Sequence, residues 1–423
     1  MLEEIRSERL GERYYKYTHS SGVTVLLYPM AGYSTVTAQF SVKFGSVDNF
    51  YSIDGGSPIY IPDGTAHYLE HKLFESPEKE AFERFAETGA SCNAGTSYDS
   101  TRYYFSCSSN FEKNLEILLD FVQSPYFTPE NVEKERGIIT QEITMYLDSP
   151  GWRVCMELYK GMFRSSPVRN DIAGSPESIA KITDKLLYDV YEAFYNPSNM
   201  YLCIAGNFDL ESAIEVCERC LKPGRAVNMR HIIDEEPPQV ITRRMEMSMP
   251  LGKTTFAMGF KSPAYPGGKM TEEYIYRTLM NDTAVGASTE FYRRMRDSGL
   301  INETFESSIM MGRGFFIPGI YGESDEPDRV AEEVCREYRR LKSCPPSKEA
   351  FLRAKKYLYG DNIRMYNNVE SVAQNLSDAA LTGTSAFDYA ELAANAGYDG
   401  MLERLMSFDE SNYCISIINP TEE

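Results

Sequence analysis

Two histidines four residues apart are the residues of this chain best suited to chemistry. They lie in the stretch "DGTAHYLEHKLFES" at residues 63–76, and the 423-residue chain has only four histidines in all. On a helix, positions i, i+3 and i+4 share one face, so His67, Glu70 and His71 would point the same way. Such a face could bind a divalent metal and supply a base. A plainer interpretation is a solvated helix face on which Glu70 pairs with the two histidines.

A catalytic zinc site needs a third ligand. Such a site uses three protein ligands and leaves the fourth position to water. The stretch "EKERGIITQEI" offers acids on a second predicted helix. Glu135 and Glu142 are two turns apart and share a face, so either could reach the metal, although an ordinary salt-bridged helix carries similar acids. Two histidines and a carboxylate also accept several divalent ions, so the sequence does not fix the metal.

The elements that must position these residues can be predicted from periodicity and turn signals. Apolar residues recur at helical spacing over residues 64–88 and again along "NFEKNLEILLDFV". Between them, "SCNAGTSYD" and "TRYYFSCS" predict two strands joined by a turn. A single helix is predicted from the cap at Thr128 and Pro129 to a point before Pro150.

Two stretches recur about half a chain apart, which predicts a duplicated domain. The segment "NPSNMYLCIAGNFD" resembles "FDESNYCISIINP", and "TPENVEKERGIITQE" resembles "PPSKEAFLRAKKYLYGD". The predicted fold class is therefore α+β, with two homologous domains. We place the catalytic domain at residues 1–222, a polar, proline-bearing linker at 223–239 and the second domain at 240–423. The last histidine is His231, so any metal site belongs to the first domain.

Composition excludes several classes of protein. A net charge of −19 and a sequence pI of 4.8 argue against nucleic-acid binding and favour cationic partners or substrates. No apolar run is long enough to span a bilayer, and the charged N-terminal stretch lacks the features of a secretory signal, so we expect a cytoplasmic protein. The nine cysteines are scattered, and the one CxxC, Cys217 and Cys220, lacks the second pair of a structural zinc site.

Three motifs together resemble a known family of peptidases. In this order and separation, "HYLEHKLF", "GASCNAGTSYDSTRYYF" and "ERGIITQEI" are similar to the motifs of the inverted-zinc-motif (HxxEH) peptidases, the family of pitrilysin, insulin-degrading enzyme and mitochondrial processing peptidase. The resemblance covers nearly the whole chain. It implies two homologous α/β domains, each a mainly antiparallel sheet packed against helices, in the duplicated LuxS and processing-peptidase metallohydrolase fold. The chain looks most similar to the zinc-bearing members of a paired bacterial subgroup.

The resemblance also implies a role for each matching residue. His67 and His71 would bind one Zn²⁺ per chain, with Glu142 as the third ligand. Glu70 would act as the general base, because a carboxylate that is not a ligand can take a proton from water and pass it to the leaving amine. Glu135 matches an acid that fixes the orientation of one histidine.

Two further positions match residues that contact substrate in the family. Asn93 matches a residue of the edge strand that lines an extended peptide, and a turn or strand-end asparagine explains it equally well. Arg296 matches an arginine of the second domain, but Asn302 and Glu303 stand where a tyrosine should follow. That tyrosine contacts substrate and helps to polarise the scissile carbonyl. Without it, either catalysis is weakened or another subunit provides the contact.

The expected function is that of a zinc-dependent metalloendopeptidase that cuts peptides or unfolded segments in a closed chamber, with cationic peptides favoured by the acidic balance. The resemblance implies a dimer, or a heterodimer with a family member that lacks the zinc motif. The alternative is a non-catalytic structural or assembly subunit of such a complex, which the intact motif argues against and the missing tyrosine favours. A zinc hydrolase for small molecules would need a narrow pocket, and the strand-like "SCNAGTS" favours an extended peptide instead.

Overall fold

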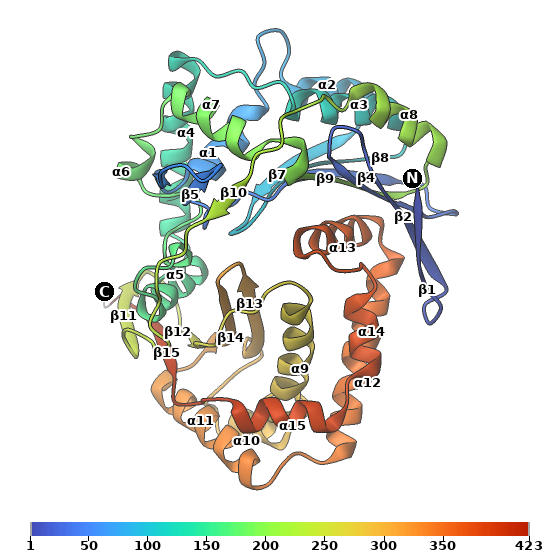
Figure 1. Cartoon of the computed structure of the whole chain (residues 1–423). Helices are drawn as coiled ribbons and strands as arrows, with labels where there is room; N and C mark the ends of the chain where they lie inside the picture. The colour runs from blue at the N-terminus through green and yellow to red at the C-terminus, as the bar shows by residue number, and fades with distance from the viewer. Residues whose placement is uncertain (1, 422–423) are drawn as a thin grey trace. The chain divides into compact units, whose positions relative to one another are not determined.

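The computed structural model describes residues 2–421, and Figure 1 shows the path of the chain. The chain forms two compact units, each assembled from separate segments. Unit 1 comprises Met1–Ile143, Asp171–Ile232 and Ile363–Phe387, and unit 2 comprises Thr144–Asn170, Ile233–Asn362 and Asp388–Glu423. None of the helices within residues 2–421 combines the length and apolar character that a membrane crossing requires.

A seven-stranded, mainly antiparallel sheet forms the centre of unit 1. In spatial order its strands are β1 (Glu3–Ser7), β2 (Glu12–Thr18), β3 (Thr24–Pro29), β9 (Met200–Gly206), β4 (Val36–Val42), β8 (Thr101–Cys107) and β7 (Ser91–Thr96). The β3–β9 pair is parallel and the other pairs are antiparallel. Strand β9 is apolar and buried along its whole length, as expected of a central strand covered on both faces. Strand β7 ends the sheet, so its outer edge can accept a further strand.

Helices cover both faces of this sheet. The first face carries α1 (Thr65–Leu73), α2 (Ala81–Thr88), α3 (Phe111–Val122), α4 (Pro129–Leu147), α7 (Asp184–Phe194) and α8 (Leu210–Cys220). Strands β7 and β8 follow α2 and precede α3 in the sequence, which confirms the predicted pair of strands joined by a turn. The helical periodicity over residues 64–88 corresponds to two helices with a break that the pattern did not show, because α1 ends at Leu73 and α2 begins at Ala81. Pro77 lies in the break, where it cannot donate a helical hydrogen bond.

The sheet of unit 2 repeats the core of the first sheet. Its strands, in spatial order, are β11 (Arg244–Met249), β15 (Tyr413–Pro420), β12 (Thr255–Phe260), β14 (Phe315–Glu323) and β13 (Glu306–Gly312). The β11–β15 pair is parallel, as the β3–β9 pair is. The order β3-β9-β4-β8-β7 therefore recurs strand for strand. Helices α9 (Gly268–Ala284) and α11 (Pro327–Ser343) pack on this sheet. The duplicated α+β fold is confirmed.

Each half of the chain supplies one helix to the other unit. Helix α5 (Pro150–Met162) packs against β15 and β12 of unit 2, and α13 (Val369–Thr382) packs against β9 and β4 of unit 1. In Figure 1, α13 lies on the face of the first sheet opposite α2 and α3. The two units therefore interleave along the sequence. The predicted division at residues 1–222, 223–239 and 240–423 follows the sequence repeat and stays a prediction.

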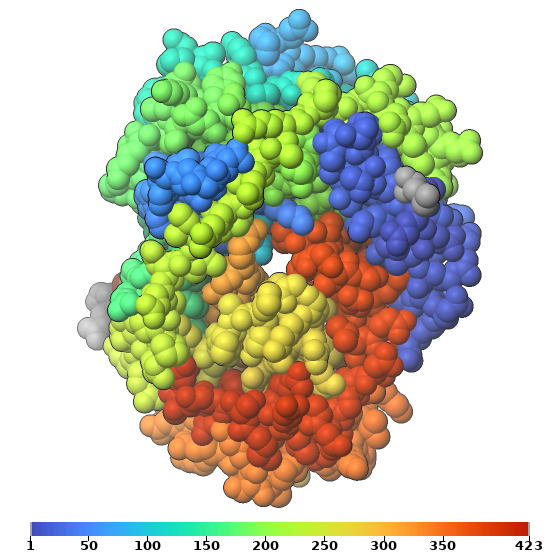
Figure 2. Space-filling model, viewed as in Figure 1, coloured from blue at the N-terminus to red at the C-terminus, as the bar shows by residue number. Residues whose placement is uncertain are grey.

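A small three-stranded sheet lies outside the main sheet of unit 1. Strands β5 (Phe50–Ile53) and β6 (Ile59–Tyr60) form a hairpin, and β10 (Met229–His231) from the linker pairs with β5. Figure 2 shows the hairpin in blue beside the yellow-green linker on the surface. The sequence did not predict these strands, which are too short to show an alternating pattern.

Candidate metal centre

Helix α1 is held in place at its start and along its length. Gly64 precedes it with φ of 89°, and a Cβ there would lie 2.5 Å from the carbonyl oxygen of Ala173, so only glycine fits. The buried Tyr68 hydroxyl donates to the carbonyl of Val132 on α4. The buried Lys72 ammonium donates to the carbonyl oxygen of Asn131 at 3.1 Å. These contacts fix the rotation of α1 against α4.

The fixed rotation brings three side chains from α1 and α4 together. One potential ligand atom from each of His67, His71 and Glu142 lies within 4.8 Å of the other two. The Nε2 atom of His67 lies 3.6 Å from Oε1 of Glu142, and the Nε2 atom of His71 lies 3.4 Å from Oε2. The two imidazole centroids are 4.6 Å apart.

These separations fit a shared metal ion better than hydrogen bonds. A contact of 3.4–3.6 Å is too long for a well-formed N–H···O hydrogen bond. Ligand atoms about 2.1 Å from a tetrahedral metal ion lie roughly 3.4 Å from one another. Two imidazoles and one carboxylate form a donor set that zinc accepts, with one position left for water. His67, His71 and Glu142 would therefore hold the metal.

Glu135 contacts the outer nitrogen of His71. Its Oε1 lies 2.9 Å from Nδ1, so the Nε2 atom of His71 is left to face Glu142. Burial lowers the pKa of His71, but the hydrogen bond to Glu135 and the interactions with Glu142 and Glu70 outweigh burial and raise it to about 10. His67 and then His71 hold the pKa of Glu142 well below its usual range. The carboxylates therefore make this cluster attractive to a cation.

Glu70 lies on the same helix but outside the ligand set. The Thr96 hydroxyl, at the end of β7, donates a 2.6 Å hydrogen bond to Oε2 of Glu70. Both Glu70 and His67 are only 8% exposed, so the two side chains are largely shielded from water. Glu70 can thus accept a proton without leaving its place on the helix.

Comparisons with known proteins identify the family. The family model described as "Insulinase (Peptidase family M16)" matches residues 52–175, and the one described as "Peptidase M16 inactive domain" matches residues 181–358. A relative from Bacillus subtilis (strain 168), named "Uncharacterized zinc protease YmfH", is 37% identical over 92% of this chain and 92% of its own length. The chain belongs to peptidase family M16.

The similarity to other M16 proteins extends along most of the chain. The crystal structure of an M16-like protein from Alicyclobacillus acidocaldarius superposes with a TM-score of 0.93 and 33% identity, covering 96% of this chain and 98% of that one. The protein named "Mitochondrial-processing peptidase subunit beta" from Neurospora crassa is 25% identical over 85% of this chain and 79% of its own length. This M16 chain is thus similar to its relatives over both sheet-bearing halves.

The two predicted substrate-contacting residues belong to different units of the structure. Asn93 is exposed on β7, and its amide oxygen accepts a 2.8 Å hydrogen bond from the backbone N–H of Ala94. Because side chains alternate along a strand, Asn93 points to the face opposite Thr96. Arg296 belongs to unit 2, where it is half-exposed on α10 (Glu290–Asp297) and lies 3.7 Å from Glu303. The substrate roles of Asn93 and Arg296 stay predictions.

Sequence reasoning missed three residues that support the cluster. Tyr68 and Lys72 connect α1 to α4, and Thr96 connects β7 to Glu70. Tyr68 and Lys72 stand within the quoted motif, and Thr96 stands within the strand motif. Their partners are far away in the sequence, so no local spacing rule could have assigned them.

Proposed function

We propose that this M16 chain is a zinc-dependent metalloendopeptidase that hydrolyses peptides or unfolded segments. The observation that carries the proposal is the convergence of His67, His71 and Glu142 beside Glu70, a carboxylate on the same helix that is not needed as a ligand. The names of the relatives as zinc proteases support zinc as the metal, with one ion per chain proposed from the single cluster among residues 2–421.

Separate residues of the chain take separate roles in the proposed hydrolysis. When bound, zinc supplies Lewis acidity, which polarises the scissile carbonyl and acidifies water at the open position. Glu70 accepts a proton as the nucleophile attacks and returns it to the leaving amine. Thr96 holds one oxygen of Glu70, so the other oxygen is free to take the proton. Glu135 holds His71 with its Nε2 atom directed at the ligand set.

An extended peptide suits this arrangement better than a compact small molecule. Strand β7 ends the first sheet and also carries Thr96, which contacts the proposed base. A peptide that adds a strand to this edge would therefore pass beside the base. Enclosure of the substrate in a chamber is implied by the family resemblance and stays a prediction.

The acidic balance of the chain favours cationic peptides among these substrates. The net charge is −19, so the long-range field attracts basic peptides and repels acidic ones. Cleavage of length-matched basic and acidic peptide pools at low ionic strength tests this. Faster cleavage of the acidic pool would contradict the cationic preference while leaving the peptidase proposal intact.

The test of the proposed function combines metal content with cleavage. Wild type, Glu70→Gln and the control Glu78→Gln, an acid in the exposed loop after α1, are purified and their zinc is measured beside cleavage of a quenched fluorescent peptide pool. We expect about one zinc in each protein and cleavage in all except Glu70→Gln. Absence of zinc from the wild type, or equal cleavage by Glu70→Gln, would overturn the proposal.

The second-domain residues favour a role for a partner. Asn302 donates a 2.8 Å hydrogen bond to Glu323, and with Glu303 it occupies the place where the family resemblance implies a tyrosine. We propose a dimer, and specifically a heterodimer with a family member that lacks the zinc motif and supplies the missing contact. The Neurospora relative is named as a subunit. Native mass measurement on co-expressed candidates tests this, and exclusive homodimers or monomers would contradict it.

The alternative function is a non-catalytic structural or assembly subunit. The absent tyrosine favours it, since a transition-state contact is missing from this chain. It predicts a complex whose assembly is unaffected by Glu70→Gln and in which no peptide is cleaved. The cytoplasmic location and the lack of nucleic-acid binding, expected from the sequence, remain predictions.

A further inference from the structure

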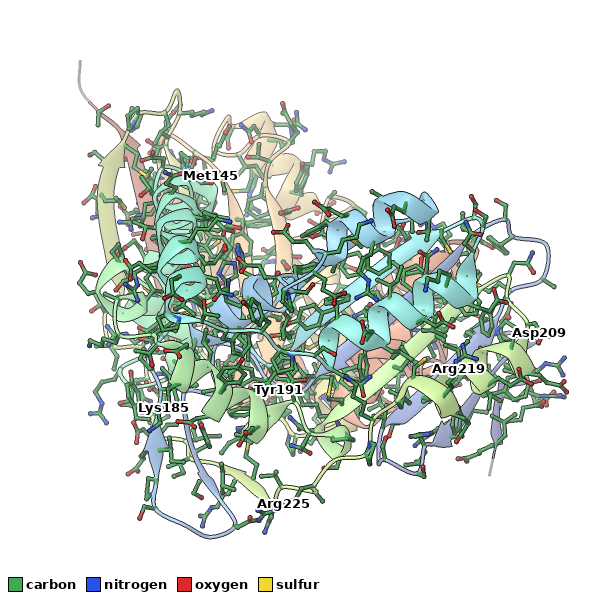
Figure 3. The ribbon with its side chains drawn as sticks, turned by 90° about the horizontal axis from the view of Figure 1, so that it is seen from above. Met145, Lys185, Tyr191, Asp209, Arg219 and Arg225 are labelled. Atoms are coloured by element: carbon green, nitrogen blue, oxygen red, sulfur yellow. The ribbon has the colours of Figure 1, made fainter. Side chains whose placement is uncertain are left out.

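A cavity of about 720 Å³ lies within unit 1, and its lining shares no residue with the metal cluster. Its walls come from the β5–β6 hairpin, from α7 and from the segment after α8. Figure 3 labels two lining residues, Tyr191 on α7 and Arg225 on that segment. Phe40 and Met200, which belong to the main sheet, supply apolar surface at its base. The volume and the apolar base are typical of a pocket for a small molecule.

Most polar groups of the lining already have partners in the protein. The hydroxyl of Tyr191 donates to the carbonyl of Val122, and the hydroxyls of Tyr195 and Tyr103 share a hydrogen bond. The ammonium of Lys222 donates to the carbonyl of Gln123, and Arg225 forms an ion pair with Asp54. Both cations of the lining are therefore engaged. A ligand would gain little from these groups, because each contact would require breaking an existing one.

Three groups of the lining remain without such partners among residues 2–421. Tyr51 is only 2% exposed and its ring packs edge-on against Phe194, yet its hydroxyl makes no hydrogen bond. Asp189 and Glu192, on the exposed side of α7, form no ion pair there. Burial, followed by the charge of Asp189, raises the pKa of Tyr51 to about 12.

We propose that this cavity binds a small organic cation, with an ammonium or guanidinium group on an apolar body. The two free carboxylates and the Tyr51 oxygen accept hydrogen bonds from such a group. The rings of Tyr51 and Tyr191 offer the electron-rich faces that attract cations, and the apolar base receives the body of the ligand. An anion would face two uncompensated carboxylates, and a neutral ligand would leave both of them unmatched.

The chemistry could belong to a free amine or to the basic side chain of a peptide, and we assign it to the free amine. The polypeptide segment after α8 and the β5–β6 hairpin both line the cavity. A cavity of about 720 Å³ between these walls suits a compact molecule better than an extended peptide. Competition with a lysine-containing tetrapeptide distinguishes the two sources.

Calorimetric titration of the full chain tests the proposal with phenethylamine and its neutral analogue phenethyl alcohol. We expect one saturable site for the amine and about tenfold weaker binding of the alcohol, since the charge-assisted hydrogen bonds are lost. Asp189→Asn should weaken amine binding by about tenfold, and Tyr51→Phe by several fold, with little effect on the alcohol. Asp184→Asn, on the same helix but outside the lining, is the matched control.

Several outcomes would overturn the inference. These are the absence of saturable amine binding, equal affinity for the alcohol, or equal effects of Asp189→Asn and Asp184→Asn. Displacement of the amine by the tetrapeptide would overturn the assignment to a free amine. Zinc content and thermal unfolding are recorded for each variant, so a folding defect is recognised. The result does not depend on peptidase activity and therefore stands apart from the proposed function.

Discussion

The hydroxyl of Thr96 is the residue-scale contact with the clearest catalytic consequence. It donates to Oε2 of Glu70 at 2.6 Å and comes from the strand that ends the sheet. A carboxylate held in this way keeps one rotamer, so the proposed base does not have to be ordered during the reaction.

Replacement of Thr96 should therefore affect turnover without affecting the metal. We expect Thr96→Val to lower kcat for a fluorescent peptide by about tenfold, because the isosteric side chain cannot donate to Glu70. Thr96→Ser keeps the hydroxyl and should retain most of the activity. Zinc content serves as the control measurement. Loss of zinc from Thr96→Val, or full activity in it, would show that the contact does not position the base.

Glu135 should influence the metal through His71. Its hydrogen bond to Nδ1 directs the other nitrogen toward Glu142, so we expect Glu135→Gln to weaken zinc binding by about tenfold to a hundredfold. Competition with a chromogenic chelator measures the affinity. Glu130→Gln, an exposed acid in the first turn of the same helix, is the matched control. Equal zinc affinities of the two variants would show that Glu135 does not influence metal binding.

The sequence predicted the composition of this cluster more fully than its internal arrangement. His67, Glu70 and His71 are linked by helical spacing, which is a local pattern and can therefore be recognised in the sequence. Glu135 and Glu142 share a face of α4, so spacing left both open as ligands. Only the rotation of α1 against α4 separates them, and contacts between residues distant in sequence set that rotation.

At the scale of elements, long periodic segments were predicted well and short ones were not. Helix α4 ends where expected, at Leu147 before Pro150. The break between α1 and α2 was missed, because apolar residues keep helical spacing across Pro77. Strand β10 is three residues long and forms because it pairs with β5. Such a short segment shows no alternation of apolar and polar residues in the sequence.

Helix α9 carries a carboxyl group that burial should make sensitive to pH. Burial raises the pKa of Asp282 from 3.8 to about 6. The folded state therefore binds this proton more tightly than the unfolded state. The stability associated with the proton is present below pH 4 and is lost as the pH rises through 6.

Asp282→Asn should remove this dependence on pH. At pH 7 we expect the variant to be more stable than the wild type by on the order of 2 kcal/mol, and near pH 4 the difference should disappear. Urea unfolding at the two pH values measures the change. Asp297→Asn, an exposed acid on α10, should show no such change. A constant difference between wild type and Asp282→Asn at both pH values would contradict the role of ionisation.

At the scale of the whole molecule, the exchange of α5 and α13 ties the two halves of the sequence together. Helix α5 comes from the first half of the sequence but packs on the sheet of unit 2. Helix α13 comes from the second half but packs on the sheet of unit 1. The contacts of α13 with its sheet include polar ones, since Ser377 accepts from Gln39 at 2.9 Å and Asp378 pairs with Arg102 at 2.8 Å. The repeated sequence segments predicted two domains but could not reveal an exchange between them.

Cutting the chain in the linker should therefore leave the two fragments associated. A recognition site for a specific protease is inserted between the exposed Asp234 and Glu235. Cleavage at this site breaks the covalent link between the two halves. We expect the cut fragments to elute together in size-exclusion chromatography and to separate only in denaturant, because each fragment holds a helix of the other unit. Separation in native buffer would show that α5 and α13 contribute little to stability.

The late position of α13 in the chain also governs the order of events during synthesis. All the candidate metal ligands lie within the first 142 residues, but the sheet beside them lacks the cover of α13 until residue 382 has left the ribosome. From the synthesis of β9 until α13 emerges, a nascent chain thus exposes the surface of β4 and β9 that α13 later covers. Unit 1 is completed only when nearly the whole protein has been made, so a truncated translation product would lack a finished unit around the candidate ligands.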